Sequence, residues 1–197
     1  MQWWETLSRF TTYLNSILQS IHCIEIIKEA SDDHLLDAEE ILYLLDRNNS
    51  LDKRLALVNA KSWSARDYVN KGQNPLNIIE AGYVYFGLDS SKGVSILPDD
   101  IQFLMIYAYA MENYHDPKES FLLLLTLDKE FIKKNLYSYQ LVFNLVNGNR
   151  FLRQSFCDVW NVSKSFFEEP GFEEVFRKEA MEIIKMYLIG YKKHCHK

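Results

Sequence analysis

The sequence is poor in residues that interrupt regular structure. Only 7 of its 197 residues are glycine and 4 are proline. An all-β protein of this length needs many tight turns, and tight turns depend on these residue types. The shortage therefore favours helices over sheets.

Cysteine is scarce too: the chain has Cys23, Cys157 and Cys195. An odd number at wide spacing is not typical of a disulfide framework. Cys23 and Cys157 fall within apolar helical patterns, which predicts small core residues. The first residues also lack the basic stretch and apolar core of a secretory signal. These features predict a reducing, cytoplasmic compartment.

Long apolar runs and an excess of basic residues are also missing. The longest apolar run, 103–111, is nine residues, whereas a membrane-spanning helix needs about 20. The net charge is −5, and both nucleic acids and anionic membranes bind mainly through basic groups. We therefore expect neither a nucleic acid nor a membrane as partner.

Apolar residues recur with the period of a helix. Phe156, Val159, Trp160 and Ser163, for example, share one helical face. The sequence predicts an all-α protein: one domain over residues 1–197, a compact bundle of about eight to ten helices. Residues 191–197 are predicted to be a frayed basic tail.

Two alternatives remain open within this fold class. The helices pair into hairpins of about 35–45 residues, so an α-solenoid-like arrangement of helical hairpins is the alternative to a bundle. In addition, two short apolar runs within residues 83–97 flank glycine-containing residues, a pattern that fits either a β-hairpin or a helix end followed by a loop.

Local signals predict where several helices begin, end and are buried. Segments 103–111 and 121–125 are apolar nearly all round, which predicts burial on every side. Pro75, Pro98 and Pro117 fit the first turn of a helix, and the residues Asn74 and Asp116 fit the capping position before the first and third of them. Residues 147–148, Asn-Gly, are predicted to end a helix.

One dipeptide suggests a metal-dependent reaction. His115-Asp116 resembles the His-Asp pair of HD-domain phosphohydrolases, which are all-helical. The resemblance implies metal ligands at His115 and Asp116, with His22 or His34 upstream and Asp158 downstream. The dipeptide is the whole of the match, and the role of Asp116 as a helix cap explains it equally well.

No other pattern predicts a catalytic, metal or cofactor site. The chain has no glycine-rich phosphate loop, no nucleophile elbow and no Cys-x-x-Cys pair. We therefore expect no cofactor and no bound metal.

Aromatic residues are plentiful, at 14% of the chain. Trp3 and Trp4 are consecutive, so a helix cannot turn both into one core, and at least one should be available to a partner. Our first hypothesis is a non-catalytic protein-interaction module: an adaptor, a chaperone-like protein or an inhibitor of the immunity type. Its partner would be a protein, with a basic one favoured because this chain is acidic, or a second copy in a homo-oligomer. The alternative is the HD-like phosphohydrolase.

Overall fold

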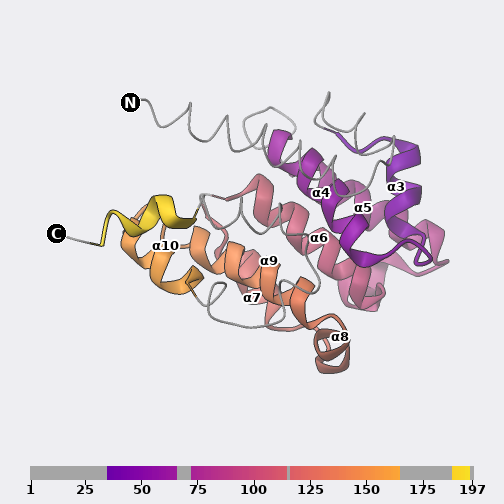
Figure 1. Ribbon diagram of the computed structural model, residues 1–197. Helices are drawn as coiled ribbons and strands as arrows, with labels where there is room; N and C mark the ends of the chain where they lie inside the picture. Colours follow the sequence, from indigo (N-terminus) through magenta and orange to yellow (C-terminus); the bar gives the residue numbers. More distant parts are fainter. Residues whose placement is uncertain (1–34, 66–71, 115, 165–187, 196–197) are drawn as a thin grey trace.

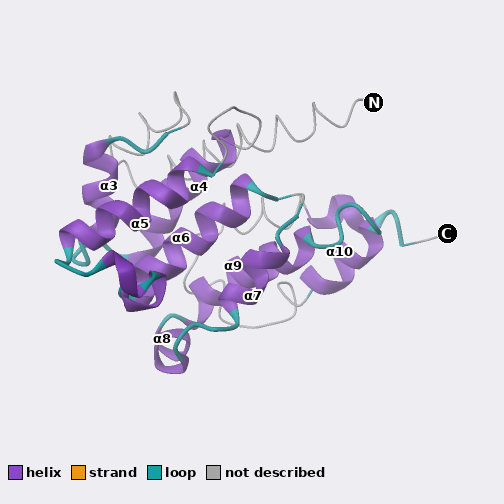
Figure 2. Cartoon of the chain, turned by 180° about the vertical axis from the view of Figure 1, so that it is seen from behind, coloured by secondary structure: helices purple, strands orange, loops and turns teal. Residues whose placement is uncertain are grey.

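The described part of the chain is entirely helical. The computed structural model describes residues 35–65, 72–114, 116–164 and 188–195, and these ranges contain no strand (Figures 1 and 2). Residues 188–192 form a further helical segment. The predicted all-α fold in a compact multi-helix bundle is confirmed. The α-helices are α3 (Ala38–Leu45), α4 (Leu51–Ala65), α5 (Gln73–Tyr85), α6 (Asp99–Glu112), α7 (Lys118–Leu124), α8 (Lys129–Lys134), α9 (Leu136–Asn149) and α10 (Phe156–Ser163).

Successive helices pair into antiparallel hairpins. In the pair α3–α4, the end of α3 meets the start of α4, because Arg54 Nη1 donates to the Leu44 carbonyl at 3.1 Å. In α5–α6, a Cβ on Gly82 would lie 3.7 Å from Ile101, and the Gly72 N–H donates to the Glu112 carboxylate. The short connections between these helices favour such neighbouring pairs.

The third hairpin joins α7 to α9. The Phe121 and Phe143 rings lie 5.4 Å apart, and the Tyr139 hydroxyl donates to the Leu124 carbonyl at 3.2 Å. These two contacts run in opposite senses along the two helices, so α7 and α9 are antiparallel. Helix α8 stands between them in the sequence, and Asn135 separates α8 from α9.

The hairpins stack in register, so that the helices form two rows. Helices α3 and α5 are parallel: the Leu36 N–H donates to Asn74 Oδ1 at 2.8 Å at one end, and Leu45 packs at Gly82 at the other. Helix α7 packs against α6, where the Tyr109 hydroxyl donates to Glu119 at 2.9 Å, and against α9. We call the first helices of the three hairpins, α3, α5 and α7, the first row, and α4, α6 and α9 the second row.

Helices α4 and α6 of the second row are parallel to each other, as α3 and α5 are. Arg54 on α4 pairs with Asp100 on α6 at 2.8 Å, and five residues further along α4 Asn59 meets Tyr107 at 2.7 Å. These contacts make α4 and α6 parallel. Within the bundle, α3–α4 and α5–α6 therefore pack as two stacked helical hairpins.

Helix α6 forms the centre of the main core. Eleven of its fourteen residues are buried, which confirms the predicted burial of 103–111. The prediction for 121–125 is wrong in part, because Leu122 and Leu125 on α7 are exposed. Helix α7 lies in the first row and has solvent on one side. A run of five apolar residues cannot show which side of the helix is exposed, because it contains no polar residue to mark that side.

Residues 83–97 form a helix end and a loop, and not the β-hairpin that was the other possibility. Helix α5 continues to Tyr85 and ends in a Schellman motif, in which the Leu88 N–H donates to the Tyr83 carbonyl and Gly87 N–H to Val84. Gly87 takes the left-handed conformation that this motif needs, with φ of 63°. Residues 90–92 and 94–96 are short 3₁₀-helices. The glycine that suggested a hairpin turn is instead a helix terminator.

The prolines mark helix starts as predicted, although their neighbours do not act as caps. Pro75 lies in the first turn of α5, while Pro98 and Pro117 stand at the N-cap positions of α6 and α7. Gly72, not Asn74, caps α5. Asn74 instead lies within the first turn, where its side chain connects α5 to the start of α3.

The helix end predicted at 147–148 is close to the observed end, but the predicted capping role of Gly148 is wrong. Helix α9 continues through Gly148 to Asn149. A Cβ on Gly148 would lie 3.0 Å from Ser163 Oγ and 3.6 Å from Val159 on α10. The glycine therefore lets α10 approach α9 closely, and it does not serve as a left-handed cap.

Candidate functional site

The His-Asp dipeptide lies between α6 and α7, and the structure describes only its second residue. Asp116 is exposed and its N–H donates to the Asn113 carbonyl at 2.8 Å. Pro117 occupies the N-cap position of α7, with no side-chain cap, so the predicted capping role of Asp116 is wrong. Asp158, the suggested distal ligand, is exposed on α10. His115, His22 and His34 lie outside the described residues.

The described residues contain no group of three histidine, cysteine or acidic side chains placed to hold a metal ion. Because the three histidines are not described, the HD-like phosphohydrolase stays a prediction. Trp3 and Trp4 also lie outside the described residues. Their proposed role in partner binding likewise stays a prediction.

A buried ion pair joins α3 to α4. Lys61 Nζ lies 2.9 Å from Glu40 Oε1 and donates to the Leu35 carbonyl at 3.0 Å, and both charged side chains are almost fully buried. Burial raises the pKa of the Glu40 carboxyl, while the Asp37 N–H and the Lys61 ammonium lower it, and the net direction is upward. Glu40 Oε2 completes a capping box by accepting from the Asp37 N–H at 2.9 Å.

A second buried ion pair joins α4 to α6 in the second row. Arg54 and Asp100 form it at 2.8 Å, and Arg47, largely exposed, reaches the same Asp100 oxygen at 3.3 Å. Tyr107 follows along α6; burial raises the pKa of its hydroxyl well above the ordinary value, and the hydroxyl donates to Asn59. These polar groups face one another inside the helix packing, so they join helices and present no surface to a substrate.

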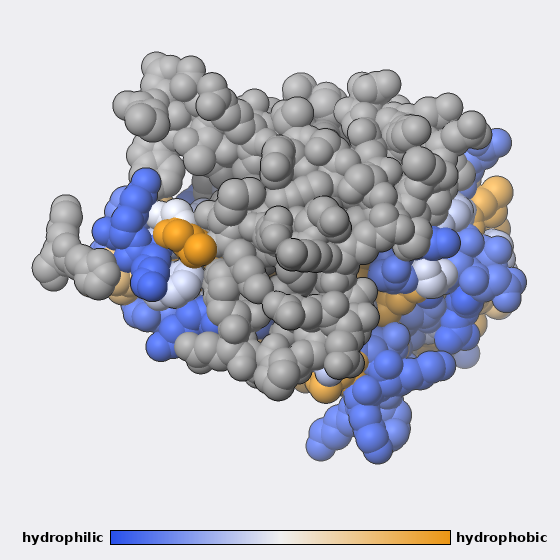
Figure 3. Space-filling model, in the orientation of Figure 1, coloured by the Kyte–Doolittle hydropathy of each residue, from blue (hydrophilic) through white to orange (hydrophobic). Residues whose placement is uncertain are grey.

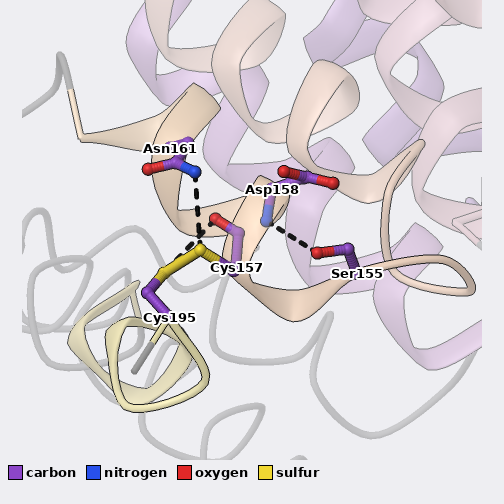
Figure 4. The surroundings of a disulfide bond; sticks show 5 residues. All are labelled: Ser155, Cys157, Asp158, Asn161 and Cys195. Atoms are coloured by element: carbon purple, nitrogen blue, oxygen red, sulfur yellow. Dashed lines mark hydrogen bonds between the residues drawn. A yellow bond between two sulfur atoms is a disulfide. The ribbon is translucent and has the colours of Figure 1, made fainter. Parts of the chain in front are cut away.

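The cysteines form a disulfide that the sequence analysis excluded. Cys157 on α10 is bonded to Cys195, with Cα atoms 4.7 Å apart (Figure 4). Asn161 Nδ2 lies 3.4 Å from the Cys157 sulfur, one turn along α10. The prediction that Cys157 is a free core residue is wrong, and the cysteine content no longer argues for a reducing compartment, since disulfides persist mainly in oxidising ones. Cys157 and Cys195 are far apart in the sequence but adjacent in space, because residues 188–195 pack beside α10.

Residues 191–195 are accordingly not a frayed tail. Tyr191 is buried and its ring stacks on Phe156 at 5.8 Å. The Lys192 ammonium lies 5.4 Å from the centre of the Trp160 ring, a favourable cation–π geometry. Figure 1 shows this segment (yellow) beside α10, at the opposite end of the molecule from α3. Residues 196–197 lie outside the described part.

The most distinctive surface feature is exposed apolar side chains on the first row. Among the described residues, eight large apolar side chains are exposed, and six of them lie on α3, α5 or the α7 helix and its C-cap. Val84 is 84% exposed. The six are Leu42, Leu76, Val84, Tyr85, Leu122 and Leu125; the other two are Leu136 and Ile189.

Five of these side chains, all except Tyr85, form what we call the first-row surface; Tyr85 is nine residues from Leu76 and lies on the opposite side of α5. Leu76 and Val84 are eight residues apart on α5, and Leu122 and Leu125 are three apart on α7, so each pair lies on one side of its helix. The buried residues of α5 and of α7 lie on the other side of each helix. In Figure 3, which views one face of the molecule, the visible apolar areas are small and bordered by hydrophilic residues.

The charges around the first-row surface are mostly negative. The exposed charged side chains within α3, α5 and α7 are three carboxylates and one ammonium. The carboxylates belong to Glu39, Glu80 and Glu119, and the ammonium to Lys118. The first-row surface is therefore apolar with an acidic border.

This surface was not predicted from the sequence. Residues 83–97 fitted either a β-hairpin or a helix end with a loop, and residues 121–125 were expected in the core. The signal was present in α5, where Leu76, Glu80 and Val84 follow one another at four-residue spacing. That spacing places two apolar residues on the same side as an acid, which a buried helix face would not contain.

A comparison with known protein families gives no match, and comparisons with curated proteins and with solved structures give none either. Among the described residues, no helix combines the length and the apolar character needed to cross a membrane.

Proposed function

We propose that this chain is a non-catalytic protein-interaction module, of the adaptor, chaperone-like or inhibitor kind, and that it binds through the first-row surface. The observation that carries the proposal is the exposure of apolar side chains on the first helix of each of three hairpins. Solvent-exposed apolar residues scattered singly are ordinary, whereas a group with a polar border is typical of a binding surface.

The arrangement of the hairpins supports the proposal. Stacked helical hairpins present one helix of each pair along an extended face, and proteins built this way use that face for binding. The second row, with its buried ion pairs and the buried α6, gives the face a rigid support. The exposed leucines bury little apolar area within the fold, so we assign them a role in binding a partner.

The test compares two matched double variants of the full chain. Leu76→Gln/Leu122→Gln removes two anchors from the first-row surface. Leu136→Gln/Ile189→Gln makes the same chemical change at exposed positions elsewhere. Leu122 and Ile189 are equally accessible, at 53% and 52%. Each tagged variant is used to isolate partners from its native cells, with circular dichroism and thermal unfolding recorded in parallel.

We expect the first-row variant to lose its stoichiometric partner and the matched variant to keep it. Both should keep their free energy of unfolding within about 0.5 kcal/mol per substitution, as is usual for surface changes. Equal recovery of the same partner by both variants would contradict the proposal.

A further inference from the structure

We infer that the segment recognised by the first-row surface is a basic amphipathic helix. This inference rests on the proposed function, since it identifies the partner of the same surface. It draws on two independent properties of that surface: the spacing of its apolar side chains and the sign of the charges at its border.

The spacing fits a helix lying across the row. Helices packed side by side, as α3 and α5 are, have axes about 8–10 Å apart. On a partner helix, apolar residues seven positions apart are about 10.5 Å apart along the axis. One partner helix can therefore place one anchor against Leu42 on α3 and another, two turns later, against α5 near Leu76. Anchors at three-, four- and seven-residue spacing are the usual pattern by which a helix binds an apolar groove.

The charges favour a basic helix. Glu39, Glu80 and Glu119 border the apolar side chains, and Lys118 is the single opposing charge on these helices within the described residues. Lysine or arginine on the flanks of a partner helix would meet carboxylates, which accelerates association and excludes acidic competitors.

The same charges disfavour a second copy of this chain. In a two-fold dimer formed by this surface, each carboxylate of the border would face the border of the other copy. Like charges brought together in this way oppose association, and the net charge of −5 adds to the repulsion.

The experiment uses three synthetic peptides of about 18 residues, roughly 27 Å long as helices. The first has leucine at positions i, i+3, i+4 and i+7 and lysine elsewhere. The second replaces every lysine by glutamate. The third has the composition of the first in an order that gives no apolar face. Binding to the full chain is measured by fluorescence anisotropy at low and at physiological salt.

We expect the first peptide to bind at least about tenfold more tightly than the other two, a difference of about 1.4 kcal/mol. Its affinity should fall with salt. Leu76→Gln/Leu122→Gln and Glu80→Lys should each weaken it about tenfold or more, whereas Leu136→Gln/Ile189→Gln and Glu130→Lys, on exposed positions outside the first row, should leave it unchanged.

Equal binding of all three peptides, or equal effects of the first-row and matched variants, would overturn the inference. So would a dimer of the wild-type chain, seen by sedimentation, that dissociates in Leu76→Gln/Leu122→Gln. If the native partner is lost in that variant while the lysine peptide does not bind, the interaction module stands and the basic helix is wrong. If the native partner is retained, the proposed function itself fails.

Discussion

The two ends of the molecule are stabilised in different ways. The main body, α3 to α9, has one continuous apolar core centred on α6, and it contains the buried pairs Lys61–Glu40 and Arg54–Asp100. At the other end, α10 and residues 188–195 form what we call the C-terminal clasp. Its separate cluster contains three buried apolar residues, and a disulfide holds it together.

The difference shows how a small contact area is compensated. Burial of a large apolar core can offset the free-energy cost of desolvating charges, and the geometry of the buried ion pairs then fixes the register of the helices. A cluster of three buried residues provides little apolar burial, and a covalent link stabilises it by restricting the unfolded chain. The two regions should therefore respond to different perturbations.

The largest expected effect is in the main body. Lys61→Met leaves the buried Glu40 carboxylate without its cation and should lower the free energy of unfolding by about 3–5 kcal/mol at neutral pH. Because burial already raises the pKa of Glu40, the loss should shrink as the pH falls and the carboxyl takes up a proton. Chemical denaturation between pH 4 and 8, roughly spanning the range in which such a carboxyl titrates, measures both effects.

The control for this prediction is Lys61→Met/Glu40→Gln. The glutamine keeps an oxygen that can accept from the Asp37 N–H and removes the charge. The double variant should recover most of the lost stability, because replacing both partners of a buried pair is often nearly neutral. A single variant as stable as the wild type would show that the pair does not anchor α3 to α4.

The second-largest effect, loss of the disulfide, should be confined to the C-terminal clasp. The disulfide spans 38 positions, and the chain-entropy relation assigns a loop of this size about 4 kcal/mol, with about 2–4 kcal/mol typical of measured cases. Cys157→Ser should therefore destabilise the clasp by that order, whereas Lys61→Met should act on the body. Hydrogen exchange, resolved by segment, should show faster exchange confined to α10 and 188–192.

Reduction by dithiothreitol should reproduce the effect of Cys157→Ser, and the control Cys23→Ser should leave it intact because Cys23 is not part of this bond. The wild type, unfolded without reductant, should show one free thiol per chain. Three free thiols would mean that the clasp is held without a covalent link, and the comparison between the two ends would then be wrong.

The smallest effect concerns the hydroxyl inside the second row. Tyr107→Phe removes the donor to Asn59 and should cost about 1–2 kcal/mol. Burial raises the pKa of Tyr107 above the ordinary 10.0, so above pH 10 the unfolded chain ionises first and stability falls as the pH rises. The phenylalanine variant should lose stability less steeply, by up to about 1.4 kcal/mol per pH unit.

Part of the alkaline decline should remain in Tyr107→Phe. Burial also raises the pKa of Tyr43 and Tyr139, and the hydrogen bond to Glu119, with burial, raises that of Tyr109. Identical alkaline slopes in the wild type and the variant would show that Tyr107 titrates as an exposed tyrosine does.

Local signals in the sequence predicted local structure well. The apolar run at 103–111 identified the central helix, and the prolines identified helix starts, because periodicity and backbone geometry act over a few residues. Features set by contacts between distant residues were not predictable in this way. A glycine at position 148 could either end the helix or allow α10 to pack closely, and the sequence around it is the same in both cases. Only the position of Ser163 in the structure shows that it allows close packing.

The same limit applies to the functional candidates. Nothing near Cys157 in the sequence indicates that Cys195 returns to it, and nothing near Arg54 indicates Asp100. The first-row surface could have been recognised in part from Leu76 and Val84 on α5. Its contribution from α7 could not, because Leu122 and Leu125 differ from buried leucines only in what packs against them.

The alignment of α4 with α6 also limits how these helices can move. Arg54–Asp100 and Asn59–Tyr107 fix the pair at two points, so a small sliding motion would strain both contacts together. The next position offering comparable side-chain packing is a full helical turn away, about 5.4 Å. Displacement of one hairpin against the next should therefore occur in whole steps.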